Sequence, residues 1–301
     1  MVIPFIKYSK VLLTVSILVT VAAFFFLAKW GLKPGIDFTG GSLLETTYSQ
    51  TRPALEDMQK VFADAGLKDT VVQKTDSNGF IVRTNFVSED LHQTILKNIR
   101  TKFQTKENVV RENRFETVGP SVSAALKQRA SWAISFVCLG IIAYVAYAFR
   151  QVSRPVASWK YGLLAIIALV HDVMLVIGVF AILGHYFGTE VDVGFVVALL
   201  TVLGYSVNDT IVVYDRIREN LQRHSADNFG EVVNNGLNQT LMRSINTTAK
   251  TLLPLVALFI WGGATIHTFT LALLIGIASG AYSSIFIAAP LLVVVEKWQR
   301  K

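Results

Sequence analysis

An aspartate lies inside an apolar segment that is long enough to cross a membrane. Between Val193 and Val213 the residues are apolar or small except near Asn208 and Asp209, and roughly 20 such residues span a bilayer as a helix. An ionisable side chain at that depth is costly, so it tends to face a bundle interior or a water path and to mark an ion or proton route. Asp209 is therefore the first candidate functional residue, and a structural hydrogen bond to a neighbouring helix is the alternative.

A second polar pair, His171 and Asp172, lies in the middle of another apolar segment. At about 1.5 Å per residue it stands roughly 15 Å from the start of that segment, too deep to reach the membrane surface easily. A polar contact inside the bundle and a direct proton relay both explain this pair. Asp215 begins a charged stretch, 215–219, where pairing between residues three and four apart is expected on a helix end.

Six apolar stretches are long enough to hold these residues within a membrane. The composition agrees, because 52% of the residues are hydrophobic, 16% are charged and the mean hydropathy is +0.47. The stretches are approximately 11–28, 130–149, 161–183, 193–213, 248–261 and 268–295. The fifth is short and contains Pro254, which a membrane helix tolerates when neighbouring groups satisfy the freed carbonyl. In the sixth, Gly276 and Gly280, extended by Ser283 and Ser284, predict close packing of helices.

Six spans place both ends of the chain on one side, and the basic residues indicate which side. Lysine and arginine occur before the first span, after the second and fourth spans and at the C-terminus, whereas the short loops near 184–192 and 262–267 have none. Both termini are therefore predicted to be cytoplasmic. The net charge of +7 then reflects topology and anionic lipid, and no nucleic-acid motif is present. The first stretch, which follows Lys7 and Lys10, is expected to be an uncleaved anchor.

The segment 31–128 is predicted to be an extracytoplasmic α+β domain. Its pattern predicts strands at 42–49, 70–74, 80–84 and 109–118 and helices at 53–65 and 88–103. This βαββαβ order is that of a ferredoxin-like domain. The segment has no metal motif, nucleophile elbow or phosphate loop, so we expect a binding or mechanical role without a cofactor, and no enzyme activity.

The predicted fold class is accordingly a membrane α-helical bundle of six transmembrane helices with an inserted α+β domain. Residues 1–30 supply the cytoplasmic N-terminus and the first transmembrane helix. Residues 129–301 supply the other five helices, their cytoplasmic loops and a cytoplasmic C-terminus.

A glycine-rich motif stands at the entrance of the external domain. It reads Gly35-Ile36-Asp37-Phe38-Thr39-Gly40-Gly41, and by itself it could be a turn in which Asp37 binds nearby backbone N–H groups. Together with the stretch 204–220 around Asp209, it resembles the SecD/SecF family of bacterial protein-export membrane subunits. The resemblance extends to His171-Asp172, to the stretch 243–248 that begins at Arg243, and to the six-span layout, so it covers essentially the whole chain.

The resemblance implies a subunit of the bacterial inner membrane, of resistance-nodulation-division type architecture, that pairs with SecD. It would use ion flow to help unfolded polypeptides through the SecYEG translocon and its accessory subunits. It links Asp209 and Arg243 with translocation of the coupling ion, H⁺ or Na⁺, and leaves His171, Asp172, Asn208 and Asp215 as supporting polar residues. A guanidinium near a carboxylate would neutralise it and shift its pKa between loading and release. Without the resemblance, Arg243 would be read as an anchor at the membrane interface.

Two other functions fit parts of the pattern. Asp172 and Asp209 could form an aspartyl dyad that shares a proton in an intramembrane protease, although no GxGD surrounds the second acid and no HExxH motif occurs. A small-molecule efflux transporter of the same architecture is the other alternative. Such exporters carry two six-span halves and a far larger external portion, whereas this chain has one half and about 100 external residues.

Overall fold

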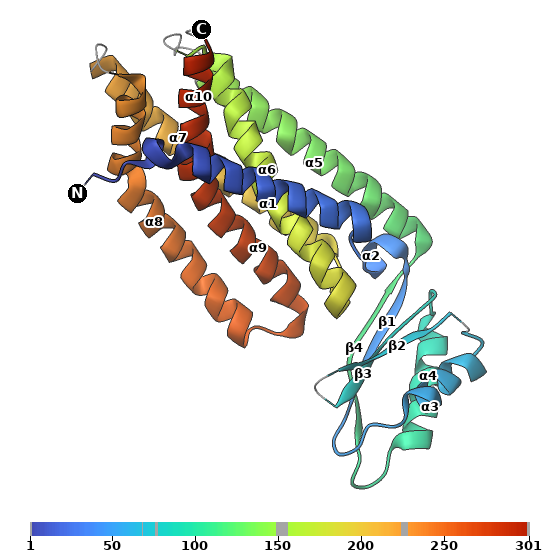
Figure 1. Ribbon diagram of the computed structural model, residues 1–301. Helices are drawn as coiled ribbons and strands as arrows, with labels where there is room; N and C mark the ends of the chain where they lie inside the picture. Colours follow the sequence, from blue (N-terminus) through green and yellow to red (C-terminus); the bar gives the residue numbers. More distant parts are fainter. Residues whose placement is uncertain (1, 68, 76–77, 149–155, 224–227, 300–301) are drawn as a thin grey trace. The chain divides into compact units, whose positions relative to one another are not determined.

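The computed structural model describes residues 2–67, 69–75, 78–148, 156–223 and 228–299 (Figure 1). The chain divides into two compact units, one formed by Met1–Lys33 with Ser131–Lys301 and the other by Pro34–Ala130. The first unit is helical and the second is an α+β unit built around one sheet.

The helical unit consists of long helices with short connections. Their bounds are η1 Phe5–Tyr8, α1 Ser9–Trp30, α5 Pro120–Ala148, α6 Ser158–Phe187, α7 Val193–Arg223, α8 Phe229–Trp261, α9 Ala264–Ser283, the π-helical turn η2 Ser284–Ala288, and α10 Ala289–Gln299. Among the described residues, six helical segments are long and apolar enough to cross a membrane. The predicted number of spans is confirmed.

Several helices extend well beyond the apolar stretches that predicted them. The fifth span was expected at 248–261, yet α8 starts at Phe229, where the side chain of Asn228 accepts a hydrogen bond from the Gly230 N–H at 3.1 Å and caps the helix. Pro254 lies inside α8 without ending it. The sixth span contains η2, and Pro290 lies just after this turn. Because a proline lacks an N–H and its ring crowds the carbonyl four residues earlier, a local widening of the helix is expected there.

Helix α7 lies at the centre of the bundle, where it packs against α6, α8 and α9. The approach to α9 is closest at two glycines, as the small-residue pattern predicts. A Cβ atom at Gly280 would stand 2.9 Å from the Cβ of Ser206, and one at Gly276 would overlap the side chain of Val202. These glycines therefore pack two helices of the same chain together, and they bring the serines of α9 next to the polar residues of α6 and α7.

The α+β unit contains one antiparallel sheet and two longer helices. Its elements are α2 Ile36–Thr39, β1 Gly41–Tyr48, α3 Leu55–Asp64, β2 Val71–Thr75, β3 Gly79–Thr84, α4 Glu89–Phe103 and β4 Val110–Val118. The strands lie in the order β2-β3-β1-β4, and all neighbours are antiparallel. Met58, Phe62, Phe80 and Ile99 are almost fully buried and belong to its core.

The predicted strands and helices of this unit occur in the predicted order. The helix expected from Pro53 begins two residues later, at Leu55, because Ala54 still has extended backbone angles. Residues 76 and 77, which belong to the hairpin signal between the second and third strands, lie outside the described residues.

Candidate functional site

Asp209 lies on the buried face of α7, with 7% of its surface exposed. Its two carboxylate oxygens accept hydrogen bonds from two different elements. The hydroxyl of Ser244 on α8 lies 2.9 Å from Oδ1, and the hydroxyl of Ser284 in η2 lies 2.8 Å from Oδ2. Among the described residues no lysine or arginine forms an ion pair with this carboxylate, so the acid is surrounded by neutral hydroxyl groups.

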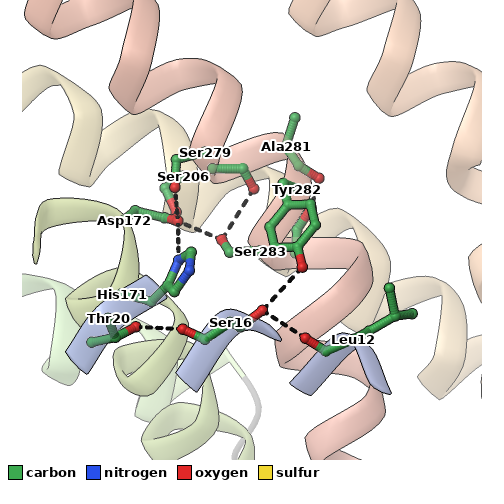
Figure 2. A network of polar contacts seen from close by, with 12 residues as sticks. Leu12, Ser16, Thr20, His171, Asp172, Ser206, Ser279, Ala281, Tyr282 and Ser283 are labelled. Atoms are coloured by element: carbon green, nitrogen blue, oxygen red, sulfur yellow. Dashed lines mark hydrogen bonds and ion pairs between the residues drawn. The ribbon is translucent and has the colours of Figure 1, made fainter. Parts of the chain in front are cut away.

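Asp172 on α6 has a larger set of partners and no exposed surface. The hydroxyls of Ser206, Ser279 and Ser283 each lie 2.6 Å from one of its oxygens, and Nδ1 of His171 lies 3.1 Å from Oδ1. Figure 2 shows these side chains converging on the carboxylate from α6, α7 and α9. O–H···O distances this short are typical of hydrogen bonds to a charged acceptor.

The sequence indicated the two acids but missed most of their partners. Ser206, Ser244 and Ser279 were not recognised, and Ser283 and Ser284 were noticed only as small packing residues. A usable signal was present on α7, where Ser206 stands one helical turn before Asp209 and so shares its face. No comparable signal marks Ser244 or Ser279, because no acidic residue lies one turn away on their own helices.

Arg243 and Asn208 lie on exposed faces of their helices. The structure does not bring Arg243 to Asp209, since no ion pair between them occurs in the described residues and the neighbouring Ser244 occupies that position instead. Asn208 likewise makes no described hydrogen bond with Asp209.

Asp215 lies at the charged end of α7, where its side chain is exposed and stands 3.9 Å from Arg218. Arg216 and Arg223 both pair with Glu219, three and four residues away. These pairs are the local contacts expected of a solvated helix end, and none of them reaches Asp209.

The glycine motif starts the α+β unit. Ile36–Thr39 form the short helix α2, in which the half-buried Asp37 lies, and the hydroxyl of Thr39 donates to the Gly35 carbonyl at 3.0 Å. Gly40 and Gly41 both have positive φ angles, of 75° and 118°. A Cβ atom at Gly41 would also stand only 2.6 Å from the carbonyl oxygen of Thr84. The two glycines of the motif therefore allow the backbone turn that leads into β1.

Comparison with known proteins decides the family. Residues 84–298 match the family model described as "Protein export membrane protein SecD/SecF, C-terminal", and residues 25–51 match "SecD/SecF GG Motif". The chain belongs to the SecD/SecF family. The first match contains both buried acids and Arg243, and the second contains the Gly35–Gly41 motif.

Similar SecD/SecF proteins cover nearly the whole chain. The protein translocase subunit SecF of Thermobaculum terrenum is 40% identical over 99% of this chain and 95% of its own length. That of Synechocystis is 39% identical over 94% and 91%. A solved structure of SecDF from Thermus thermophilus, described as a translocon-associated membrane protein, has a TM-score of 0.82 and is 31% identical over all of this chain. This chain spans 39% of the length of that SecDF chain.

The geometry also argues against the alternative function of an intramembrane aspartyl protease. In an aspartyl dyad the two carboxyl groups share one proton, yet Asp172 and Asp209 bind separate sets of serines and do not hydrogen-bond to each other in the described structure. The similar proteins are named translocase subunits, which is a transport role. The site is therefore a pair of buried, hydroxyl-bound carboxyl groups inside a multi-pass membrane protein.

Proposed function

We propose that this chain works with SecD as an ion-gradient-driven subunit of the bacterial Sec machinery, helping to complete the passage of unfolded polypeptides through SecYEG. The observation that carries the proposal is the likeness to SecF subunits over almost the entire chain, combined with the buried position of Asp209 inside its matched region. The SecDF structure contains a further region that this chain does not match, which is consistent with a separate SecD partner.

Asp209 is the proposed carrier of the coupling ion. Its hydroxyl partners stand at hydrogen-bond distances of 2.9 and 2.8 Å, which suits a proton that joins or leaves the carboxylate. Na⁺ is the alternative ion, because hydroxyl and carboxylate oxygens also coordinate hard cations. No resident cofactor is required by either ion.

Arg243 is proposed to become the counter-charge of Asp209 in another state of the cycle. Successive residues of a helix point about 100° apart, so a rotation of α8 by one position would replace Ser244 with Arg243 beside the carboxylate. A guanidinium there stabilises the ionised acid, and its departure favours protonation. The present arrangement, with Ser244 on Asp209 and Arg243 exposed, then corresponds to the state without the counter-charge.

The exposed polar residues suggest where SecD binds. Asn208 on α7 and Arg243, Asn246 and Lys250 on α8 are exposed within helices that are long and apolar enough to cross a membrane. Polar side chains on membrane-spanning helices normally face a partner, a water path or the membrane surface rather than lipid. The matching half of a SecD subunit is the partner that this face would meet.

We further propose an orientation in the bacterial inner membrane with both termini in the cytoplasm and the α+β unit outside. The basic residues of the loops support this orientation. The strand order β2-β3-β1-β4 with two helices supports a ferredoxin-like architecture for the external domain.

Co-purification and an export assay test the function together. The full chain, purified from bacterial membranes under mild conditions, is expected to bring down a SecD-type subunit and translocon components. Inverted membrane vesicles that contain the chain should complete export of a precursor faster when an ion gradient is imposed than when it is collapsed. Vesicles without the chain serve as the control. An equal response to the gradient with and without the chain contradicts the proposal.

A further inference from the structure

Asp172 is a second carboxyl group at membrane depth, and the proposed exchange at Asp209 does not use it. It is fully buried on α6, its partners come from α6, α7 and α9, and in the described residues it forms no ion pair with a lysine or arginine. Among the described residues, His171 is the one partner of Asp172 that can carry a positive charge. An ionised carboxylate buried without a counter-charge is costly, so this pair is balanced only when it holds a proton.

Three of the hydrogen bonds to Asp172 come from serine hydroxyls. A hydroxyl both donates and accepts hydrogen bonds and can rotate, whereas guanidinium and backbone N–H groups only donate. Ser206, Ser279 and Ser283 can donate to the ionised acid, and one of them can turn to accept from the protonated acid. Ser283 has a second acceptor for its own proton, because the Gly280 carbonyl lies 3.2 Å from its oxygen. Both protonation states of Asp172 are therefore satisfied without moving a helix.

His171 connects this carboxyl group with a cavity. The cavity has a volume of about 400 Å³ and is lined by residues of α1, α6 and α9, among them Ser16, His171 and Tyr282. The hydroxyls of Ser16 and Tyr282 lie 3.1 Å apart, and the rings of Tyr282 and His171 stack at 6.1 Å (Figure 2). The imidazole thus has Nδ1 on Asp172 and also lines this largely apolar cavity, so a water molecule that enters the cavity can exchange a proton with it.

Asp172 and Asp209 are also linked through neighbouring residues of one segment. Ser283 donates to Asp172, and Ser284, the next residue, donates to Asp209. The helix widens into the π-helical turn η2 at this point, a distortion that often occurs at functional sites. Ser206, which binds Asp172, stands one turn from Asp209 on α7. A change in the hydroxyl orientation or backbone at 283–284 therefore acts on both acids.

We propose that Asp172 is a second proton-binding carboxyl group of this chain, which exchanges its proton with His171 and is coupled to Asp209 through Ser283 and Ser284. In the exchange the Nδ1–H bond of the imidazolium breaks and an O–H bond forms on Oδ1, leaving a neutral imidazole and a neutral carboxylic acid. The proton comes from the solvent, and no other reactant is needed. Among the described residues, the titratable groups linked to Asp172 are His171 on α6, Tyr282 on α9 through its ring contact with His171, and Asp209 on α7 through Ser283 and Ser284, and α1 contributes the hydroxyl of Ser16.

The use of this proton in export rests on the proposed function, but its binding can be measured separately. Infrared spectra of the full chain with SecD in lipid vesicles report protonated carboxyl groups through their C=O band. The wild-type band from buried acids is expected to change with pH in two components. Asp172→Asn should lose one component entirely, and Asp209→Asn should lose the other.

Single-hydroxyl variants keep the test valid if Asp172→Asn fails to assemble. Ser279→Ala removes a donor from Asp172 alone, so it should shift the Asp172 component and leave the Asp209 component in place. Ser244→Ala is the matched control, because it removes a donor from Asp209 alone. A pH-dependent band that survives Asp172→Asn unchanged, or that Ser279→Ala leaves unshifted, overturns the proton site.

The coupling and the role of His171 have their own readouts. Ser284→Ala, which removes a donor from Asp209, should also shift the Asp172 component, whereas Ser244→Ala should not. His171→Gln keeps a hydrogen-bond donor next to Asp172 without a titratable ring, and it should slow hydrogen–deuterium exchange of the Asp172 carboxyl group at least tenfold. Unchanged behaviour in these two variants refutes the coupling and the exchange step. If wild-type export ignores the gradient while the Asp172 component persists, the export function is overturned and the proton site stands.

Discussion

Replacing Asp209 by asparagine should separate the ion-coupling role of this residue from its structural role. Asparagine has nearly the same shape as aspartate but no titratable proton. Its carbonyl oxygen can accept from Ser244, and its amide can donate to Ser284. Ser284 can then give its own proton to the Ala281 carbonyl, which already lies 3.1 Å from the Ser284 hydroxyl oxygen. All of the described hydrogen bonds of the site therefore have a replacement.

The expected structural cost of Asp209→Asn is small. Exchanging one satisfied hydrogen bond for another costs about 1 kcal/mol or less. Asp209→Ala is the matched control, because it leaves the buried Ser244 hydroxyl without its partner, and an unsatisfied buried group costs about 1–3 kcal/mol. The melting temperature of the purified complex should consequently be near that of the wild type for the asparagine variant and clearly lower for the alanine variant.

The functional effect should be the same for both variants. We expect Asp209→Asn and Asp209→Ala to lose at least nine-tenths of the gradient-stimulated export in membrane vesicles, whereas export in the absence of a gradient continues. The measurement is the fraction of precursor whose translocation is completed with and without an imposed ion gradient, at equal amounts of the chain and of SecD. Full stimulation of the asparagine variant would refute the carrier role and assign Asp209 to a structural hydrogen bond between helices.

Four further predictions concern the arrangement of the helices and of the α+β unit. Arg243→Lys should insert with normal topology yet lose most gradient-stimulated export, because an ammonium lacks the planar fork that holds a carboxylate; near wild-type export would leave Arg243 as an interfacial anchor. Gly276→Ala should destabilise the complex by about 1–3 kcal/mol, because the added methyl group overpacks against Val202. An unchanged melting temperature would contradict the close α7–α9 contact. Residues 34–130 made alone should give mixed helix and sheet signals in circular dichroism with a cooperative melt, since their core is contained within the unit. Burial raises the pKa of Tyr48 in this unit to about 12, so the unfolded state ionises first, and stability should fall by about 1.4 kcal/mol per pH unit between the ordinary tyrosine pKa of about 10 and the folded-state pKa. Tyr48→Phe should remove this part of the loss, and an equal loss in that variant would refute the assignment.

The helices and strands were predictable because their signals are local. A stretch of about 20 apolar residues identifies a membrane helix whatever its neighbours are, and alternating residues identify a strand. Helix ends were predicted less well, since the first part of α8, residues 229–247, is too polar to be recognised as part of a membrane span, and its start depends on the cap at Asn228.

The sequence by itself also indicated two acids that the structure shows to be buried. A carboxylate at membrane depth is costly anywhere in the bundle, so Asp172 and Asp209 stand out from composition and position alone. Arg243 was indicated by family resemblance, and its role stays a prediction, because its distance from Asp209 is set by the rotation of α8 and not by its place in the chain.

Only the tertiary structure decided how each acid is held. The serines that bind Asp172 stand 34, 107 and 111 residues away in the chain, and serine has no periodic pattern that would announce such a partner. Their convergence depends on the contact of α7 with α9 at Gly276 and Gly280. It also depends on which of two adjacent residues faces inward, since a turn of about 100° exchanges one side chain for the next. Packing fixes that rotation. As a result Ser244, and not Arg243, binds Asp209, while Ser283 binds Asp172 and Ser284 binds Asp209.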